Sequence, residues 1–238
     1  MSKLYAGTSG WAYPSWKPDF YPAKLASKKF LEYYATRLNS VELNYTFRRY
    51  ASEKILNGWS QMTPEGFLFS VKAHQMITHV RKLRDAADLA REFLGSLQPL
   101  ATAGKLGTVL FQLPPFLKCD LALLRDFLSP LPRSLRFTFE FRHASWFNEQ
   151  VYAALKEHNA ALCLAESEML AAPEVQTADF VYFRLRKPKY SAEERRQTAR
   201  KAASLVAGGK DVFVYYKHED TPEGAAYAEE LLAAGRPA

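Results

Sequence analysis

Polar and apolar residues alternate most clearly between Asn39 and Phe47, in the sequence Asn-Ser-Val-Glu-Leu-Asn-Tyr-Thr-Phe. Successive side chains of a strand point to opposite faces, so Ser40, Glu42 and Asn44 share one face and the apolar residues share the other. The segment Arg136 to Arg142 repeats this alternation and also carries a carboxylate on its polar face. Helical sequence follows each segment, so the apolar faces predict strands that are covered by helices.

The same periodicity along the rest of the chain predicts eight strands that alternate with helices. The expected strands are residues 3–8, 39–47, 67–72, 106–112, 136–142, 161–166, 179–185 and 211–217. Helix starts are expected at the capping residues Ser27, Ser52, Asp85, Asp120 and Asn148, and further helices at residues 191–207 and 222–234.

Eight such units in 238 residues predict an α/β fold, a (β/α)8 TIM-barrel-like structure in which residues 1–238 form a single domain. The sixth unit has the weakest pattern, because the segment Met169 to Thr177 is short and contains Pro173. An open doubly wound sheet is therefore the alternative.

In a closed barrel, side chains of one parity point into the lumen. The expected inward polar residues are Thr8, Glu42, Asn44, Ser70, Lys72, Thr108, Gln112, Thr138, Glu140, Arg142, Glu166, Tyr182, Arg184 and Tyr216. Most of them lie near the C-terminal ends of the expected strands, where TIM-barrel enzymes have their active sites. This pattern favours a functional site at that end, although a buried and mutually satisfied charge network is the structural alternative.

Within this set, Glu42 and Glu140 are the candidate catalytic acid and base, because two carboxylates in one cavity separate in pKa. The candidate ligand-binding residues are Asn44, Lys72, Gln112, Arg142, Trp146, Arg184 and Tyr190. The cations among them would attract a carboxylate, a phosphate or a developing oxyanion. Trp146 offers a ring for stacking, and Tyr190 belongs to a basic cluster after the seventh strand.

The composition narrows the classes of function. A net charge of +7 permits an anionic partner, including nucleic acid, without requiring one. The sequence has neither an apolar run of about 20 residues nor a signal-peptide pattern, so we expect a cytoplasmic protein without a membrane partner. No cofactor motif occurs, and Cys119 and Cys163 indicate neither a disulfide framework nor a metal site. A metal site of Glu and His residues stays open as a minor alternative.

Several motifs, read together, resemble the YecE-like family, catalogued as domain of unknown function 72. They are Gly7-Thr8-Ser9-Gly10-Trp11, Phe20-Tyr21-Pro22, Val41-Glu42-Leu43-Asn44, Phe69-Ser70-Val71-Lys72, Thr78-His79, Phe111-Gln112-Leu113-Pro114-Pro115 and Glu140-Phe141-Arg142 with Ser145-Trp146. The resemblance implies a TIM-barrel-like fold with a groove at the C-terminal strand ends, and an analogy with endonuclease-IV-like barrels.

The chain departs from the family pattern on one side. It has Arg186-Lys187 where His-Gly is expected, Lys217-His218 where an Asn pair is expected, and Glu166 where an Asp is expected. The sequence thus supports three hypotheses: a barrel that binds a small polar or anionic ligand, with acid/base chemistry of the hydrolase, lyase or isomerase type; a protein that binds or processes nucleic acid; and a non-catalytic scaffold.

Overall fold

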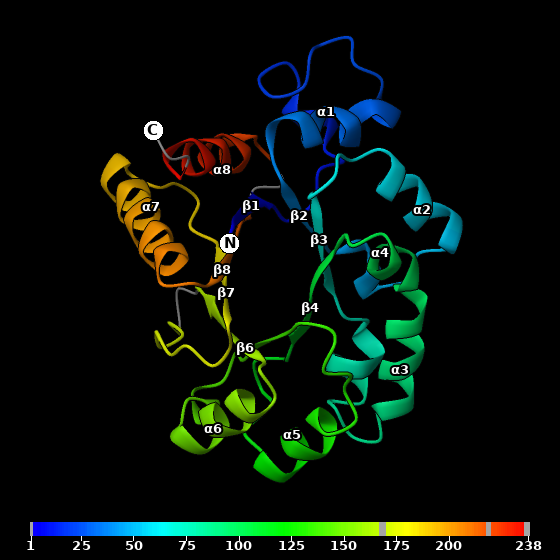
Figure 1. Ribbon diagram of the computed structural model, residues 1–238, viewed down its shortest axis with the longest axis vertical. Helices are drawn as coiled ribbons and strands as arrows, with labels where there is room; N and C mark the ends of the chain where they lie inside the picture. The colour runs from blue at the N-terminus through cyan, green and yellow to red at the C-terminus, as the bar shows by residue number, and fades with distance from the viewer. Residues whose placement is uncertain (1, 167–169, 218–219, 236–238) are drawn as a thin grey trace.

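The computed structural model describes residues 2–166, 170–217 and 220–235. Within these residues the strands are β1 (Leu4–Thr8), β2 (Ser40–Leu43), β3 (Leu68–Lys72), β4 (Leu106–Gln112), β5 (Phe137–Glu140), β6 (Ala161–Ala165), β7 (Phe180–Leu185) and β8 (Asp211–Tyr216). The paired strands are parallel, and hydrogen-bonded neighbours follow the order β1-β8-β7-β6-β5-β4-β3-β2. Figure 1 shows the strands at the centre of a ring of helices, which confirms the TIM-barrel-like fold.

The helices are α1 (Phe30–Arg37), α2 (Glu53–Gln61), α3 (Ala87–Ser96), α4 (Gln98–Thr102), α5 (Leu121–Leu128), α6 (Glu149–Glu157), α7 (Ala192–Ala207) and α8 (Glu223–Ala234). In the connection between β6 and β7, the described residues 170–179 contain no helix, consistent with the weak pattern of the sixth unit. None of the helices in the described ranges combines the length and the apolar character that crossing a membrane would require.

Helix starts follow the predicted caps where a side-chain oxygen reaches a backbone amide. Ser52, Asp120 and Asn148 each accept a hydrogen bond from the first turn of α2, α5 and α6. Two predicted caps are wrong. Ser27 lies inside a short 3-10 turn that precedes α1, and Asp85 has a φ of 46° two residues before α3 begins.

Two predicted strands are too long. β2 ends at Leu43 because Asn44 turns to a helical backbone conformation (φ −94°, ψ −12°) and residues 45–47 form a 3-10 turn. β5 is likewise confined to residues 137–140 of the predicted 136–142. The polar residues just beyond each strand therefore sit on the rim of the barrel rather than inside a sheet.

β1 and β2 stand at the two ends of the strand order, and side chains join them. The amide of Asn39, just before β2, accepts a hydrogen bond from the backbone N–H of Ala6 at 2.9 Å and donates one to the carbonyl of Leu4 at 2.8 Å. The backbones approach closely at Gly7, where a Cβ atom would lie only 1.9 Å from the carbonyl oxygen of Ser40. Only glycine fits this position without displacing the backbones at the junction of β1 and β2, which we call the seam.

Tyr34 of α1 covers the same seam from outside the barrel. Its hydroxyl donates to the carbonyl of Ser40 at 3.0 Å and accepts from the backbone N–H of Thr8 at 2.9 Å. The Thr8 hydroxyl lies 3.0 Å from the Tyr34 hydroxyl, so Thr8 faces α1 and its predicted inward position is wrong. The next side chain, Ser9, faces the lumen and donates to Glu42 at 3.1 Å.

The lower lumen is filled by a compact apolar and aromatic cluster: Tyr5, Leu68, Leu110, Ala161, Cys163, Phe180, Tyr182, Phe213 and Tyr215. In β8 it is Tyr215 that points inward, while Tyr216 packs outside against Tyr190 and Tyr227, so the inward assignment of Tyr216 is wrong. Glu166 is also misplaced by parity, because its carboxylate accepts from the hydroxyl of Tyr190 on the helix-facing side.

Candidate functional site

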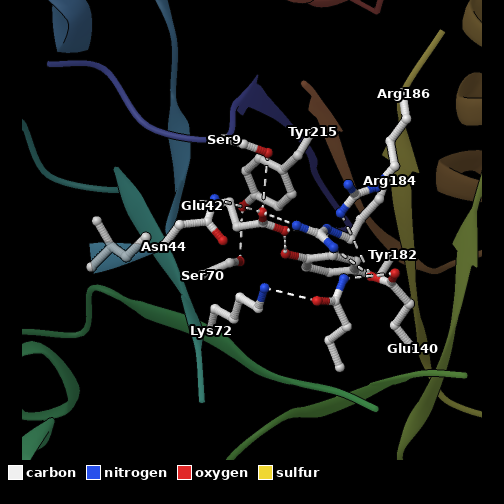
Figure 2. Close-up of polar contacts among 12 residues, drawn as sticks. Ser9, Glu42, Asn44, Ser70, Lys72, Glu140, Tyr182, Arg184, Arg186 and Tyr215 are labelled. Carbon is white, nitrogen blue, oxygen red and sulfur yellow. Dashed lines mark hydrogen bonds and ion pairs between the residues drawn. The ribbon is translucent and has the colours of Figure 1, made fainter. Parts of the chain in front are cut away.

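The upper lumen is organised around the guanidinium of Arg184, which comes from β7 (Figure 2). Its Nε and Nη2 atoms donate to the two oxygens of Glu42, at 2.8 and 2.6 Å, and its Nη1 donates to Glu140. All three side chains are almost fully buried, with at most 4% of each exposed. Strands β2, β5 and β7 thereby place a −1, +1, −1 charge triad across the barrel.

Neutral donors complete the shell of both carboxylates. Glu42 also accepts from the hydroxyl of Tyr182 at 2.7 Å and from the amide of Asn44 at 3.3 Å. Glu140 accepts from the amide of Gln112 at 2.8 Å. The buried carboxylates are therefore satisfied by fixed donors, which is what makes such buried charge tolerable.

The triad keeps both carboxylates ionised. Burial alone would raise the pKa of Glu42, but the charge and hydrogen bonds of Arg184, with the hydroxyl of Tyr182, lower it to about 2. For Glu140, burial is again outweighed by Arg184, and the pKa lies below its ordinary value. At neutral pH each side chain is consequently a carboxylate that accepts hydrogen bonds.

A hydroxyl layer lies directly beneath the charges. The Tyr215 hydroxyl contacts those of Ser40 and Ser70, the latter at 2.8 Å. Thr108 and Thr138 form a second pair at 3.0 Å. The first group joins β2, β3 and β8, and the second joins β4 and β5, so hydroxyl groups from five strands form the floor under the site.

A cavity of about 560 Å³ opens above the triad. Its lining is cationic: Arg48, Arg49, Lys72, Arg142, Arg184, Arg186 and Lys217, together with Ser9, Asn44, Tyr45, Phe47 and Gln112. Among the described residues, Arg48, Arg142 and Lys217 form no ion pair, and Arg49 lies over the ring of Tyr45 instead. The cavity wall thus has a large excess of positive charge, because the carboxylates behind it already hold Arg184.

A second, more apolar cavity of about 700 Å³ lies beside the first, towards β5, β6 and β7. The two share Arg142 and Arg186, and the second is also lined by Glu140, Phe141, Glu166 and Leu170. The backbone N–H of Arg186 donates to Glu166 at 2.9 Å, while one guanidinium nitrogen of Arg186 lies 3.9 Å from Glu140. Arg186 therefore stands between the two cavities.

Lys72, at the end of β3, has a different environment from the arginines. Its Nζ donates to the Gln112 side-chain carbonyl at 2.8 Å and lies 4.2 Å from the centre of the Phe47 ring. Burial, and then the charge of Arg184, lower the pKa of Lys72 to about 8. His79 packs edge-on against the same Phe47 ring, and burial with the Lys72 charge lowers its pKa as well.

The structure brings together most of the predicted site residues. Glu42, Asn44, Lys72, Gln112, Glu140, Arg142 and Arg184 all lie in the triad or line one of the two cavities. Trp146 does not: it is fully buried, stacks on Phe141 and donates from its indole nitrogen to the carbonyl of Leu117 at 2.8 Å. Tyr190 is also set apart, with its hydroxyl bonded to Glu166 and to the backbone of Lys187.

The sequence-based prediction missed part of the cavity wall. Arg48, Arg49 and Phe47 come directly after β2, and their position after a strand with a polar inward face was the available signal. Ser9 was not among the predicted inward residues, but it donates to Glu42. Of the departures noted earlier, Arg186 and Lys217 line the cationic cavity, whereas His218 lies outside the described residues.

Within the described ranges, no three His, Cys, Asp or Glu side chains come together as metal ligands. The alternative site of Glu and His residues thus gains no ligand set from this part of the chain. Both described cysteines have a raised pKa, caused first by burial, so neither is an activated thiol.

Known proteins resemble this chain in sequence and in fold. The protein YunF of Bacillus subtilis is 35% identical over 161 residues, which are 63% of this chain and 54% of YunF; the chain thus spans about half the length of this curated relative. A crystal structure of a DUF72 family protein from Thermotoga maritima superimposes with a TM-score of 0.83 at 26% identity, covering 96% of this chain and 97% of that one.

More distant barrels share only the fold. A family 2 AP endonuclease from Brucella melitensis superimposes with a TM-score of 0.54 at 13% identity, over 95% of this chain and 98% of that one. The family model described as "Protein of unknown function DUF72" matches residues 5–237. The chain therefore belongs to the DUF72 family, as the motifs around Glu42, Lys72, Gln112 and Glu140 predicted.

Proposed function

We propose that this protein binds a small ligand with several negative charges, of the phosphate-bearing class, in the cationic cavity above the triad. The excess of Lys and Arg on the cavity wall carries this proposal. Seven cationic side chains line the cavity, and the triad carboxylates Glu42 and Glu140 are already occupied by Arg184 behind it. A polyanion would supply the missing negative charge.

The buried triad supports this role indirectly. Arg184 is fixed at three of its nitrogens, so its position does not depend on a ligand. Arg142 and Lys217 are exposed on the rim and are free to close on a bound anion. A rigid base with adjustable cations above it is an arrangement that reduces the entropy lost on binding.

We propose that Glu42 and Glu140 do not act as an acid and a base in turn, because neither holds a proton at neutral pH. Their lowered pKa values leave each as a carboxylate at neutral pH, so in this site each can serve as a base or as an electrostatic anchor. Proton transfer by these residues stays a prediction. Variants Glu42→Gln and Glu140→Gln that lose stability but keep the full ligand response would favour the scaffold hypothesis instead.

The test uses inorganic tripolyphosphate as the probe. Thermal shift and calorimetry at low salt are expected to show binding that weakens as salt rises. The double variant Arg142→Gln/Lys217→Gln should lose most of the response, whereas the matched control Arg91→Gln/Lys156→Gln, which removes two exposed charges elsewhere, should keep it. Equal responses in both double variants would contradict the proposal.

Nucleic acid is the second candidate, and one observation favours it. Arg48 and Arg49 are adjacent, exposed and on the outer edge of the cavity, where a phosphodiester backbone would reach them. Labelled single- and double-stranded oligonucleotides titrated across a salt series would decide between the candidates. Salt-dependent binding of oligonucleotides that exceeds binding of tripolyphosphate, and that falls on Arg48→Gln/Arg49→Gln, would favour nucleic acid.

A further inference from the structure

We propose that Lys72 is a carbonyl-reactive amine, which forms an imine with an aldehyde or ketone group of an anionic ligand held in the cationic cavity. The inference adds covalent chemistry to the proposed anion site and rests on that function for the choice of ligand. Lys72 lines the cavity from the end of β3, and its Nζ is held at 2.8 Å from the Gln112 carbonyl oxygen.

Lys72 is a lysine in a cavity wall whose cations are mostly arginines. Five of the seven cations that line the cavity are arginines, which do not lose their proton in proteins. The two lysines differ in exposure: Lys217 is exposed, whereas Lys72 is partly buried. A partly buried lysine beside other cations is the environment in which an amine becomes neutral and nucleophilic.

The Lys72 ammonium contacts a neutral amide and an aromatic ring. Among the described residues no carboxylate lies within ion-pair distance of its Nζ, which instead donates to the neutral amide of Gln112. The Phe47 ring covers it at 4.2 Å. If Lys72 served only to neutralise a buried carboxylate, it would be expected to form an ion pair with Glu42 or Glu140. Both of these carboxylates are paired with Arg184 instead.

The charges around Lys72 come from several elements and act in opposite directions. Burial and the charges of Arg184 and Arg186 lower its pKa, while Glu42 and Glu140 raise it, and the net value is about 8. His79, on the other side of Phe47, has a lowered pKa and is neutral near pH 7. At pH 7 about 9% of Lys72 would then be neutral, against about 0.04% of an ordinary lysine.

Imine formation at Lys72 needs only the amine and the carbonyl compound, and it releases water. The ammonium loses a proton to solvent, and the neutral Nζ attacks the carbonyl carbon to give a carbinolamine. Loss of water then leaves the C=N bond, and protonation of the imine nitrogen restores the positive charge beside Gln112. The ligand class is an oxo-acid or a phosphorylated aldehyde or ketone, because the arginines that surround Lys72 would hold its anionic group.

The probe is pyridoxal 5′-phosphate, an aldehyde that carries a phosphate, with phosphate-free pyridoxal as the second arm. Brief exposure of the folded wild-type protein to either aldehyde, borohydride reduction and peptide mapping report which lysines have formed imines. In both arms we expect Lys72 to be labelled at least about ten-fold faster than Lys217 and the exposed Lys54, because its larger neutral fraction is only partly offset by weaker nucleophilicity. The labelling rate at Lys72 should rise with a midpoint near pH 8.

Two variants keep the result interpretable. Lys72→Arg keeps the charge without a primary amine and should lose the fast label, while Lys54→Arg, at an exposed position of α2 outside the cavity, should retain it. Labelling of Lys72 by pyridoxal no faster than Lys54 would overturn the imine proposal. Fast labelling of Lys72 with no advantage of the phosphorylated aldehyde would support the amine and count against the anion site, so the two failures are distinct.

Discussion

Replacing Arg184 by methionine is the most direct test of the buried triad. The substitution removes the fully buried cation that bridges Glu42 and Glu140 and leaves only the more distant Arg186, 3.9 Å from Glu140, as a counter-charge. Removal of one partner from a buried ion pair costs about 3–5 kcal/mol, and two carboxylates lose their partner here, so the upper part of that range applies. For a chain of this size, a loss of about 4–5 kcal/mol corresponds to a fall of about 8–20 °C in Tm.

The pH dependence follows from the two pKa shifts. In the wild type, the folded-state pKa of Glu42 is below its unfolded value of about 4.5, so its contribution is present above that pH and is lost as the pH falls towards 2. In Arg184→Met, burial without the guanidinium raises the carboxylate pKa values. The folded variant then binds protons more tightly than the unfolded chain, and its stability falls as the pH rises from 5 to 8.

Urea denaturation followed by tryptophan fluorescence at pH 5 and pH 8 gives the free energies of unfolding. The matched control is Arg91→Met, whose partner Asp88 is 90% exposed and whose loss should cost less than about 1 kcal/mol. The triple variant Glu42→Gln/Glu140→Gln/Arg184→Met should recover part of the loss, because no unpaired charge remains. A cost below about 1 kcal/mol, or one that is equal at both pH values, would refute this account.

Two further predictions concern the scaffold. Gly7→Ala places a methyl group against the Ser40 carbonyl and should lower the free energy of unfolding by about 1–3 kcal/mol or more. Gly58→Ala, in an open position of α2, should instead stabilise the protein by about 0.5–1 kcal/mol. Chemical denaturation compares the two variants, and equal effects would contradict the close approach of β1 and β2 at Gly7. Lys105→Met removes three hydrogen bonds, one to the carbonyl of Ser60 and two to Thr63, and should cost about 1.5–3 kcal/mol by the same assay. An unchanged free energy of unfolding would contradict a stabilising role for these bonds.

The sequence predicted the order of strands and helices because each strand has an apolar face of period two and because α2, α5, α6 and α7 begin at a residue whose side chain caps the helix. Its errors arise where a single backbone rotation decides the outcome. Asn44 has the polarity expected of the strand pattern, but its backbone is helical and ends β2. Asp85 is a residue type that often caps a helix, but its φ is positive and it does not begin α3. Such turns depend on tertiary contacts that a period of two does not encode.

The site was predicted in part, and parity explains both the success and the failures. Glu42, Lys72, Gln112, Glu140 and Arg184 lie in the middle or at the end of regular strands, where alternation assigns them to the lumen correctly. The inward assignment was wrong at Thr8, Glu166 and Tyr216, which lie at or just beyond a strand end and have the opposite parity. Trp146 was a stacking candidate only because it follows a strand, and its ring is buried against Phe141. The pairing of both carboxylates with one arginine depends on distances across the barrel, which no local pattern contains.

The joint between β1 and β2 has a mechanical consequence for the cavity above it. Other neighbouring strands are paired by backbone hydrogen bonds, whereas β1 and β2 are joined through side chains, among them the carboxamide of Asn39 and the phenol of Tyr34. Ser9 and Glu42, on opposite sides of this joint, share a hydrogen bond, so widening it would pull directly on the triad. We therefore expect any widening of the barrel at this joint to displace Glu42, and with it the charges that face the cavity.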